Sequence, residues 1–294
     1  MLEQITCPAD LRRLSHDDLG LLSHEIRNFI VETVQENGGH LGSNLGVVEL
    51  TIALHRVFDS PRDIMLWDTG HQAYVHKMLT GRLENFKSLR KAGGLSGYPS
   101  RAESEHDWIE NSHASTALSY AFGIATAQAS DEGEGRRVIA VIGDGALTGG
   151  MAFEGLNNLG HAGSNAIIIL NDNGRSYAPT VSLLSDSLKK LRNNPKYLEQ
   201  QEKLENKVKS LLPSKEVMGL SVERAIDAAK AAVREIWDPT SFFEDLGLRY
   251  NGPFDGHNIE ALEKAFRNAA GFEGPTVIHV LTEKGRGYGP AEND

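Results

Sequence analysis

Two short polar motifs contain the residues best suited to chemistry. One is GDGALTGG, which contains Asp144, and the other is Asn171-Asp172-Asn173. The glycines let a ligand approach the backbone closely, and the start of a following helix offers N–H groups to a phosphate. A carboxylate in such a turn would repel a phosphate unless a divalent cation lay between them. Asp144, Asn173 and a nearby backbone carbonyl are the kind of oxygen ligands that Mg²⁺ prefers, so we predict a metal–diphosphate site.

Two other phosphate-binding motifs do not fit this stretch. The dinucleotide fingerprint G-x-G-x-x-G requires glycine where Thr148 stands. A P-loop requires Gly-Lys followed by Ser or Thr, and that sequence does not follow. The interpretation of the stretch therefore stays with a metal and a diphosphate.

The elements around the two motifs predict one β-α-β unit of a parallel sheet. Apolar runs at 138–142 and 166–170 have the length and β-branched character of buried strands, and residues 151–159 between them suit a helix. Ligands of parallel sheets bind at the carboxyl ends of the strands. Asp144 and Asn173 follow the two runs directly, so both are expected at that edge. The alternation of strands and helices along the chain predicts an α/β fold with a parallel sheet covered by helices on both faces.

Three histidines stand at similar junctions. His40 follows the Gly38-Gly39 break, His71 follows a strand-like run at 64–67, and His113 begins a helix-compatible segment. Taken alone, His40 is better interpreted as an exposed loop residue, and His113 as a simple helix cap. Three such placements in one chain favour a common site, since loops at strand ends are where ligand-facing residues gather. Lys284 follows the strand-like run 276–281 and suits either a phosphate or a surface loop.

Six longer motifs give the chain a family resemblance. GGHLGSNLGVVELTIALH, WDTGHQAYVHKMLTGR, GGLSGYPSRAESEHDW, GDGALTGGMAFEGLNN, GPFDGHN and KGRGYGPAE all resemble 1-deoxy-D-xylulose 5-phosphate synthases, which are thiamine diphosphate enzymes of the transketolase-like superfamily. The resemblance runs from about residue 10 to the last residue, and it covers only the first domain of those enzymes.

The resemblance implies thiamine diphosphate and Mg²⁺ as cofactors and assigns roles to individual residues. Asp144, Asn173 and the backbone carbonyl of Arg175 would hold the metal. The cofactor would also contact Gly145, Ala146, Ser115, Asn173 and Lys284, and the catalytic residues would be His40, His71 and His113.

Composition limits the class of protein. A chain of 294 residues with 40% hydrophobic and 24% charged residues is that of an ordinary globular protein, and its formal net charge of −10 argues against nucleic acid as a partner. Cys7 is the only cysteine, so an intrachain disulfide is excluded. No apolar run reaches the length of a membrane span and no secretory signal is recognisable, so a cytoplasmic protein is expected.

The domain prediction is a single diphosphate-binding domain over residues 1–294, with a charged helical excursion around 178–213. Helices are also predicted at 83–91 and 222–236, a long loop at 93–111, and turn structure at 252–257. The pyrimidine-binding and C-terminal domains of the family are expected to be absent, together with the glutamate that activates the cofactor.

The function expected from the resemblance is that of a cofactor-binding subunit. A second polypeptide would carry the missing domains in a hetero-oligomer, a dimer of heterodimers. The complex would decarboxylate pyruvate and transfer the two-carbon unit to an aldose phosphate such as glyceraldehyde 3-phosphate. The alternatives are a subunit of a transketolase-like or specialised-metabolism ketol transferase, a non-catalytic thiamine diphosphate-binding protein, and a fragment of a full-length enzyme.

Overall fold

The computed structural model describes residues 1–130, 135–174, 216–217, 220–221 and 241–292. The chain divides into two compact units, residues 1–180 with 246–294, and residues 181–245. In the second unit β4 (Glu216–Val217) pairs antiparallel with β5 (Leu220–Ser221), and α12 spans Ser241–Asp245. The predicted charged excursion at 178–213 and the predicted helix at 222–236 lie outside the described residues.

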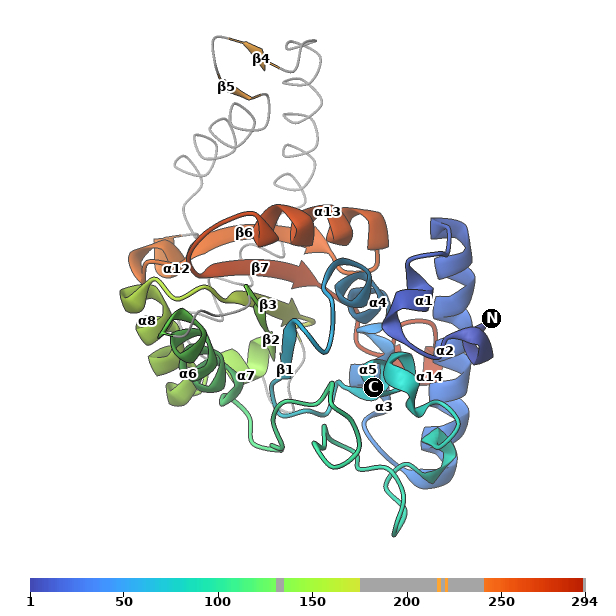
Figure 1. The fold of residues 1–294 in the computed structure, drawn as a ribbon. Coiled ribbons are helices and arrows are strands. Elements are labelled where there is room, and N and C mark those ends of the chain that lie inside the picture. The colour runs from blue at the N-terminus through green and yellow to red at the C-terminus, as the bar shows by residue number, and fades with distance from the viewer. Residues whose placement is uncertain (131–134, 175–215, 218–219, 222–240, 293–294) are drawn as a thin grey trace. The chain divides into compact units, whose positions relative to one another are not determined.

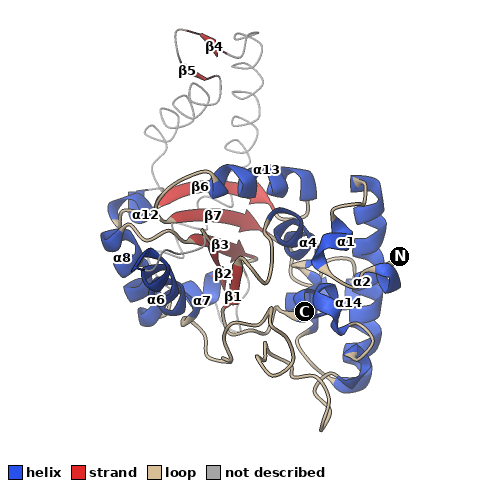
Figure 2. Cartoon of the chain, viewed as in Figure 1, coloured by secondary structure: helices blue, strands red, loops and turns tan. Residues whose placement is uncertain are grey.

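The larger unit contains a parallel sheet, shown in red in Figure 2. Its order is β1-β2-β3-β7-β6, and every neighbouring pair in it is parallel. Nearly every residue of the central strands is buried, which is why they appear in the sequence as continuous apolar runs rather than alternating ones. The strands are β1 (Ile64–Trp67), β2 (Val138–Gly143), β3 (Ile167–Asp172), β6 (Arg249–Asp255) and β7 (Thr276–Leu281).

Helices cover both faces of this sheet. α6 and α8 pack on each other on one side, and α4 and α13 pack together on the other (Figure 1). The predicted α/β fold with a parallel sheet between helices is therefore confirmed. The helices of this unit are α1 (Pro8–Leu11), α2 (His16–Asn37), α3 (Leu41–Leu45), α4 (Val48–Val57), α5 (Tyr74–Lys77), α6 (Ala117–Ser130), α7 (Asp144–Leu147), α8 (Gly150–Ala162), α13 (Ile259–Ala270) and α14 (Gly289–Glu292), with shorter helical turns at Leu2–Gln4, Met78–Arg82 and Phe86–Ser88.

Two local predictions were wrong. Of the helix predicted at 83–91, only the single turn Phe86–Ser88 forms, because the side chain of Asn37 binds the carbonyl of Lys87 and Arg90 adopts a positive φ of 61°. The turn predicted at 252–257 mostly belongs to β6, which continues to Asp255 beside β7. Gly252 absorbs the irregularity there, with a φ of 132° next to a shift in the strand register.

Residues 93–111 form neither helix nor strand, as predicted. Their backbone is instead held by turns and by bonds to the side chains of Glu103 and Asp107. None of the described helices combines the length and apolar character needed to cross a membrane.

Candidate active site

The carboxyl ends of the central strands gather the predicted site residues at one edge of the sheet. Gly143 at the end of β2 lies beside Asn171 near the end of β3, and Asn171 lies beside Val280 of β7. Because the strands are parallel and adjacent, the segments that follow them emerge side by side. Asp144, directly after β2, and Asn173, directly after β3, therefore begin segments that leave adjacent strands, although the two residues are far apart in the sequence.

His40 and His71 come together from two different elements. Their ring centroids lie 5.4 Å apart with an interplanar angle of 71°. His71 follows β1, while His40 follows α2 after Gly38 and Gly39 and is the N-cap of α3. Gly39 has a φ of 146°, and an added Cβ would lie 2.7 Å from the Tyr74 hydroxyl oxygen, so a side chain larger than hydrogen is strained there.

The side chain of Asn44 joins the backbones of the two histidines. Its Nδ2 donates to the carbonyls of both His40 and His71, each at 2.7 Å. Its Oδ1 accepts from the amide of Tyr74 at 3.0 Å, so the same side chain serves the first N–H group of α5. Asn44 is fully buried. Sequence reasoning missed this residue, because no local pattern indicates that its partners lie in two other segments.

Burial keeps both histidines neutral near pH 7. It lowers the pKa of His71 to about 4, with smaller contributions from the neighbouring His40 and Lys284. Burial also lowers the pKa of His40, assisted by the positive charge of Arg90. The Nδ1 atoms of both rings are buried and have no hydrogen-bond partner within the described part of the chain. Each ring therefore has one nitrogen whose hydrogen-bonding capacity is not used within the described part of the chain.

Lys284 comes from the segment that follows β7, and this segment contacts α3. The amide of Gly285 donates to the carbonyl of Gly42 at 2.9 Å, and a Cβ added to Gly42 would lie 3.2 Å from Cγ of Lys284. The segment after β7 thus rests on α3, directly behind His40.

A buried ion pair supports that segment. Glu49 accepts from Arg27 through two bonds of 2.6 Å, and it also pairs with Nδ1 of His257 at 3.0 Å. The Glu283 amide donates to Nε2 of the same imidazole at 3.0 Å. Burial alone would raise the pKa of Glu49, but the bonds from His257 and Arg27 outweigh it and lower that pKa to about 2. His257 lies in the quoted motif GPFDGHN, but it was not among the predicted site residues.

A chain of polar side chains ties three strand ends together beneath the histidines. Nδ2 of Asn171 donates to Oε1 of Gln72 at 2.8 Å, and the Thr282 hydroxyl donates to Oδ1 of Asn171 at 2.5 Å. Gln72 follows His71 directly, and its amide nitrogen lies 3.5 Å from Nε2 of that histidine. Gln72, Asn171 and Thr282 are all buried, so the chain fixes how the ends of β1, β3 and β7 meet.

Ser115 is joined to the GDGA segment. Its hydroxyl donates to the carbonyl of Ala146 at 2.6 Å, and its amide donates to Asp68 at 2.9 Å. The backbone of Ser115 has a φ of 74°, a conformation that is uncommon for a residue with a side chain. Burial raises the pKa of Asp68, although the amides of Ala117 and Ser115 oppose the change. The structure thus places Ser115 beside Ala146, as expected if both contact one ligand.

The residues around Asp144 fit the predicted metal–diphosphate group. Asp144 is the first residue of α7 rather than part of an open turn, and it is half-buried, as is Asn173. A carboxylate and an amide oxygen at adjacent strand ends suit Mg²⁺. Among the described residues no cluster of three His, Cys, Asp or Glu side chains is arranged for a metal, but the predicted site includes only one such side chain. Arg175, the predicted third ligand, lies outside the described residues.

His113 is not brought to the histidine pair. Its side chain is exposed, and its amide donates to Oδ1 of Asn111 at 2.7 Å. In the ranges that the structure covers, no ring contact or hydrogen bond joins it to His40 or His71. The structure therefore brings His40, His71 and Lys284 near one another, and separately joins Ser115 to Ala146.

Comparison with solved structures identifies the class of fold. The transketolase from Leishmania mexicana matches 92% of the chain with a TM-score of 0.64 at 18% sequence identity, and the chain covers 37% of that protein. The transketolase from Campylobacter jejuni matches 94% of the chain with a TM-score of 0.62 at 19% identity, and 39% of it is covered. The fold is thus that of the transketolases.

Sequence comparison identifies the family within that class. The family model described as 1-deoxy-D-xylulose-5-phosphate synthase matches residues 2–282, and the chain belongs to this family. The 1-deoxy-D-xylulose-5-phosphate synthase of Mycobacterium leprae is 56% identical over all 294 residues, and that of Frankia casuarinae is 54% identical over the same length. The chain spans 45% and 44% of the lengths of these two relatives.

Proposed function

We propose that this chain is the diphosphate-binding part of a thiamine diphosphate-dependent enzyme of the 1-deoxy-D-xylulose-5-phosphate synthase type. The observation that supports the proposal is the parallel register of β1, β2 and β3, because Asp144 and Asn173 directly follow two of these adjacent strands and His71 follows the third. The family membership and the names of the relatives support the same reading. The reaction proposed is decarboxylation of pyruvate and transfer of the two-carbon unit to an aldose phosphate such as glyceraldehyde 3-phosphate.

The chain's own residues divide into a binding group and a proton-handling group. Asp144, Asn173 and the carbonyl of Arg175 would hold Mg²⁺, and the backbone N–H groups of Gly145 and Ala146 would contact the diphosphate. The positive charge of Lys284 would attract a phosphate to the same edge. Thiamine diphosphate, when bound, supplies a carbanion-stabilising centre that side chains lack.

The histidine pair would accept and return protons during the reaction. Both rings are neutral near pH 7, so each can accept a proton without first losing one. Asn44 and Gln72 would hold the rings in place. His113 is proposed to join them only when a ligand or partner brings its segment inward, because its ring is exposed in this structure.

Further domains are proposed to complete the site, carried by a second polypeptide in a dimer of heterodimers. The relatives are more than twice as long as this chain. Tyr120 of α6 and Met151 and Phe153 of α8 are 44%, 51% and 49% exposed, on helices that pack together next to α7. Large exposed apolar side chains on two helices that pack together suit a contact with another protein surface.

Ketol transfer from a sugar phosphate is a second candidate, because the solved structures that share the fold are transketolases. The two reactions differ in the donor, which is pyruvate in one and a ketose phosphate in the other. Release of carbon dioxide distinguishes them directly.

One experiment tests the function and the assembly together. The chain is purified alone and with the product of the neighbouring gene, and each fraction is sized by chromatography with light scattering. The same fractions are assayed with pyruvate or a ketose phosphate as donor and an aldose phosphate as acceptor. We expect a stable complex, carbon dioxide release from pyruvate by that complex, and no turnover by the lone chain. Robust turnover by the lone chain would overturn the need for a partner, and a complex inactive with pyruvate would overturn the reaction.

A further inference from the structure

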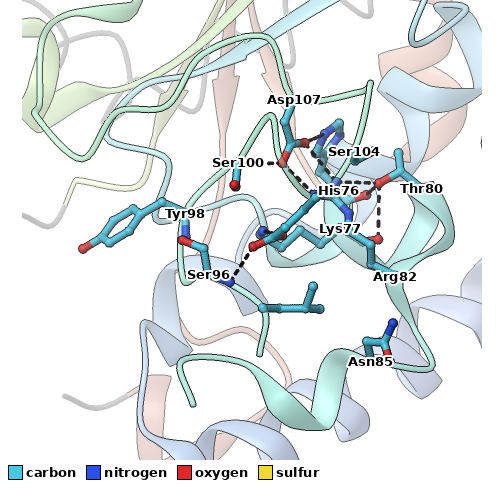
Figure 3. Close-up of polar contacts among 12 residues, drawn as sticks. His76, Lys77, Thr80, Arg82, Asn85, Ser96, Tyr98, Ser100, Ser104 and Asp107 are labelled. Atoms are coloured by element: carbon cyan, nitrogen blue, oxygen red, sulfur yellow. Dashed lines mark hydrogen bonds and ion pairs between the residues drawn. The ribbon is translucent and has the colours of Figure 1, made fainter. Parts of the chain in front are cut away.

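The loop at residues 93–111 is held by buried charges rather than by regular secondary structure. Two carboxylates of the loop, Glu103 and Asp107, pair with Lys77 and Arg82 of the segment that follows β1. Figure 3 shows Asp107 beside Arg82. The side chains of Lys77 and Asp107 are completely buried. Two cationic side chains thus pair with two carboxylates. Such pairing is needed because an unpaired buried charge is strongly destabilising.

Asp107 holds the loop at one point. Both of its oxygens accept from Arg82, at 2.6 and 2.9 Å, and one of them also accepts from the amide of Ser100 at 2.7 Å. Nε2 of His76 pairs with the carboxylate at 3.0 Å. Burial would raise the pKa of Asp107, but the bonds from His76 and Arg82 hold it well below its ordinary range. The carboxylate therefore stays ionised and ties the backbone at Ser100 to the body of the protein.

The buried histidines behind Asp107 have one consistent proton arrangement. Because Asp107 is ionised, Nε2 of His76 must donate to it, and Nδ1 of His76 must then accept from Nε2 of His55 at 2.9 Å. Burial lowers the pKa of both imidazoles, so both are neutral. The chain from His55 to Asp107 is thus a fixed support and lies apart from the His40–His71 pair.

Glu103 holds the loop at a second point, four residues earlier. One of its oxygens accepts from the amide of Ser96 at 2.6 Å, and the other pairs with Lys77 and, at 3.5 Å, with Arg82. The amides of Ser96 and Ser100 are therefore both clamped by carboxylates seven residues further along the chain. Tyr98 lies midway between the two clamps.

Tyr98 points away from the charged group (Figure 3). Its ring centroid lies 5.9 Å from that of His40. A Cβ added to Gly70, the residue before His71, would lie 2.6 Å from Cδ of Pro99 and 3.4 Å from Cδ1 of Tyr98. The clamped segment thus rests against both the residue before His71 and the ring of His40.

We propose that residues 96–100 form a fixed wall of the His40–His71 site, with Tyr98 as the side chain that confines His40, and that Glu103 and Asp107 are positioning residues acting through this wall. The role in the reaction rests on the proposed function. The placement of Tyr98 does not rest on the proposed function, because it follows from the bonds that Glu103 and Asp107 make to the backbone on either side of it.

The test compares Asp107→Asn and Tyr98→Leu with the matched control Glu263→Gln in the purified protein. Glu263 is also a buried carboxylate between two arginines, Arg56 and Arg267, but it lies on α13. Amide exchange at residues 96–100 and the imidazole resonances of His40 are followed by NMR over a pH titration. Arg90 acts on His40 directly and Lys284 acts on its neighbour His71, so both charges are kept in every variant.

We expect Asp107→Asn to speed exchange at residues 96–100 by about tenfold or more, because local opening replaces the clamped state. It should also move the His40 resonances and raise the pKa of His40, since water then reaches the ring. Tyr98→Leu should move the His40 resonances without changing amide exchange at residues 96–100. Tyr98→Phe should give His40 resonances like those of wild type. Glu263→Gln should lower the melting temperature while leaving both readouts unchanged. If Asp107→Asn does not fold, Glu103→Gln should speed exchange at Ser96.

If amide exchange at residues 96–100 is unchanged in a folded variant of Asp107 or Glu103, these carboxylates do not hold the segment. If the His40 resonances are unchanged in Tyr98→Leu, Tyr98 does not confine His40. In the assembled enzyme, Tyr98→Leu should lower kcat with unchanged affinity for the cofactor, while Tyr98→Phe stays close to wild type. An unaltered kcat in Tyr98→Leu would overturn the positioning role. The NMR readouts need no turnover, so an inactive wild-type complex would count against the proposed function and leave the wall standing.

Discussion

The rings of His40 and His71 meet edge to face at a centroid distance of 5.4 Å. Two cations at that distance would repel each other, and burial would add to the cost of each charge. The pKa values of both rings are accordingly lowered, that of His71 to about 4. The pair is therefore a neutral donor and acceptor unit near pH 7 rather than a cationic one.

Asn44→Leu should destabilise the protein strongly, because it leaves the carbonyls of His40 and His71 and the amide of Tyr74 without their buried partner. Each unsatisfied buried group costs about 1–3 kcal/mol, so a loss of at least about 3 kcal/mol in the free energy of unfolding is expected. Asn44→Asp keeps the acceptor for Tyr74 but should also destabilise the protein, because a buried carboxylate cannot donate to the two carbonyls. Urea unfolding measures both values, and a loss below about 1 kcal/mol in Asn44→Leu would show that the bridge contributes little.

His71→Ala and His113→Ala should lower turnover of the assembled enzyme far more than they weaken cofactor binding, since a group that acts in the transition state affects kcat. Losses of about 10²–10⁴-fold are typical of a proton-transfer residue. The exposed His24 of α2 provides the control variant His24→Ala. Steady-state kinetics at saturating cofactor give the answer. Normal kcat with weakened cofactor binding would instead assign the two histidines to cofactor positioning.

The stability of the protein should fall as the pH is lowered from 6.5 to 4, and His71 should account for part of the fall. Its ordinary pKa of 6.5 drops to about 4 in the folded state, so only the unfolded chain takes up a proton in that window. The contribution of His71 to the free energy of unfolding is therefore complete above pH 6.5 and is lost as the pH falls to 4. Its largest value is roughly 3 kcal/mol. Urea unfolding across this range should give a shallower slope for His71→Gln than for wild type. Equal slopes would contradict the lowered pKa.

Asp144→Ala should abolish Mg²⁺-dependent binding of thiamine diphosphate while the fold is kept, because Asp144 is a half-buried residue at the start of a short helix. The affinity should fall at least about a hundredfold. Residues that only orient a metal ligand already cost about 10–100-fold when they are replaced, and Asp144 is proposed to bind the metal itself. Calorimetry on the assembled enzyme measures the affinity and circular dichroism checks the fold. The exposed Asp17→Ala is the control. Affinity equal to wild type would mean that the metal lies elsewhere.

Local sequence was sufficient for the elements whose signals are short-ranged. β1 and β7 have the predicted bounds, because their apolar patterns end at clear turn residues. The β-α-β unit that carries Asp144 and Asn173 was confirmed for the same reason. The two wrong predictions, at 83–91 and 252–257, fall where the bond to Lys87 from Asn37 and the pairing with β7 override local preference.

The sequence by itself determined the parallel sheet, the family and the two motifs that end at its edge, since each depends on residues close together in the chain. Only the tertiary structure decided which residues share a site. The strand order brings Asn171 between Gln72 and Thr282, and Asn44 joins the segments of His40 and His71, while His113 remains exposed. Such contacts depend on how distant segments pack, and burial of the histidines, which sets their charge, exists only after that packing has formed.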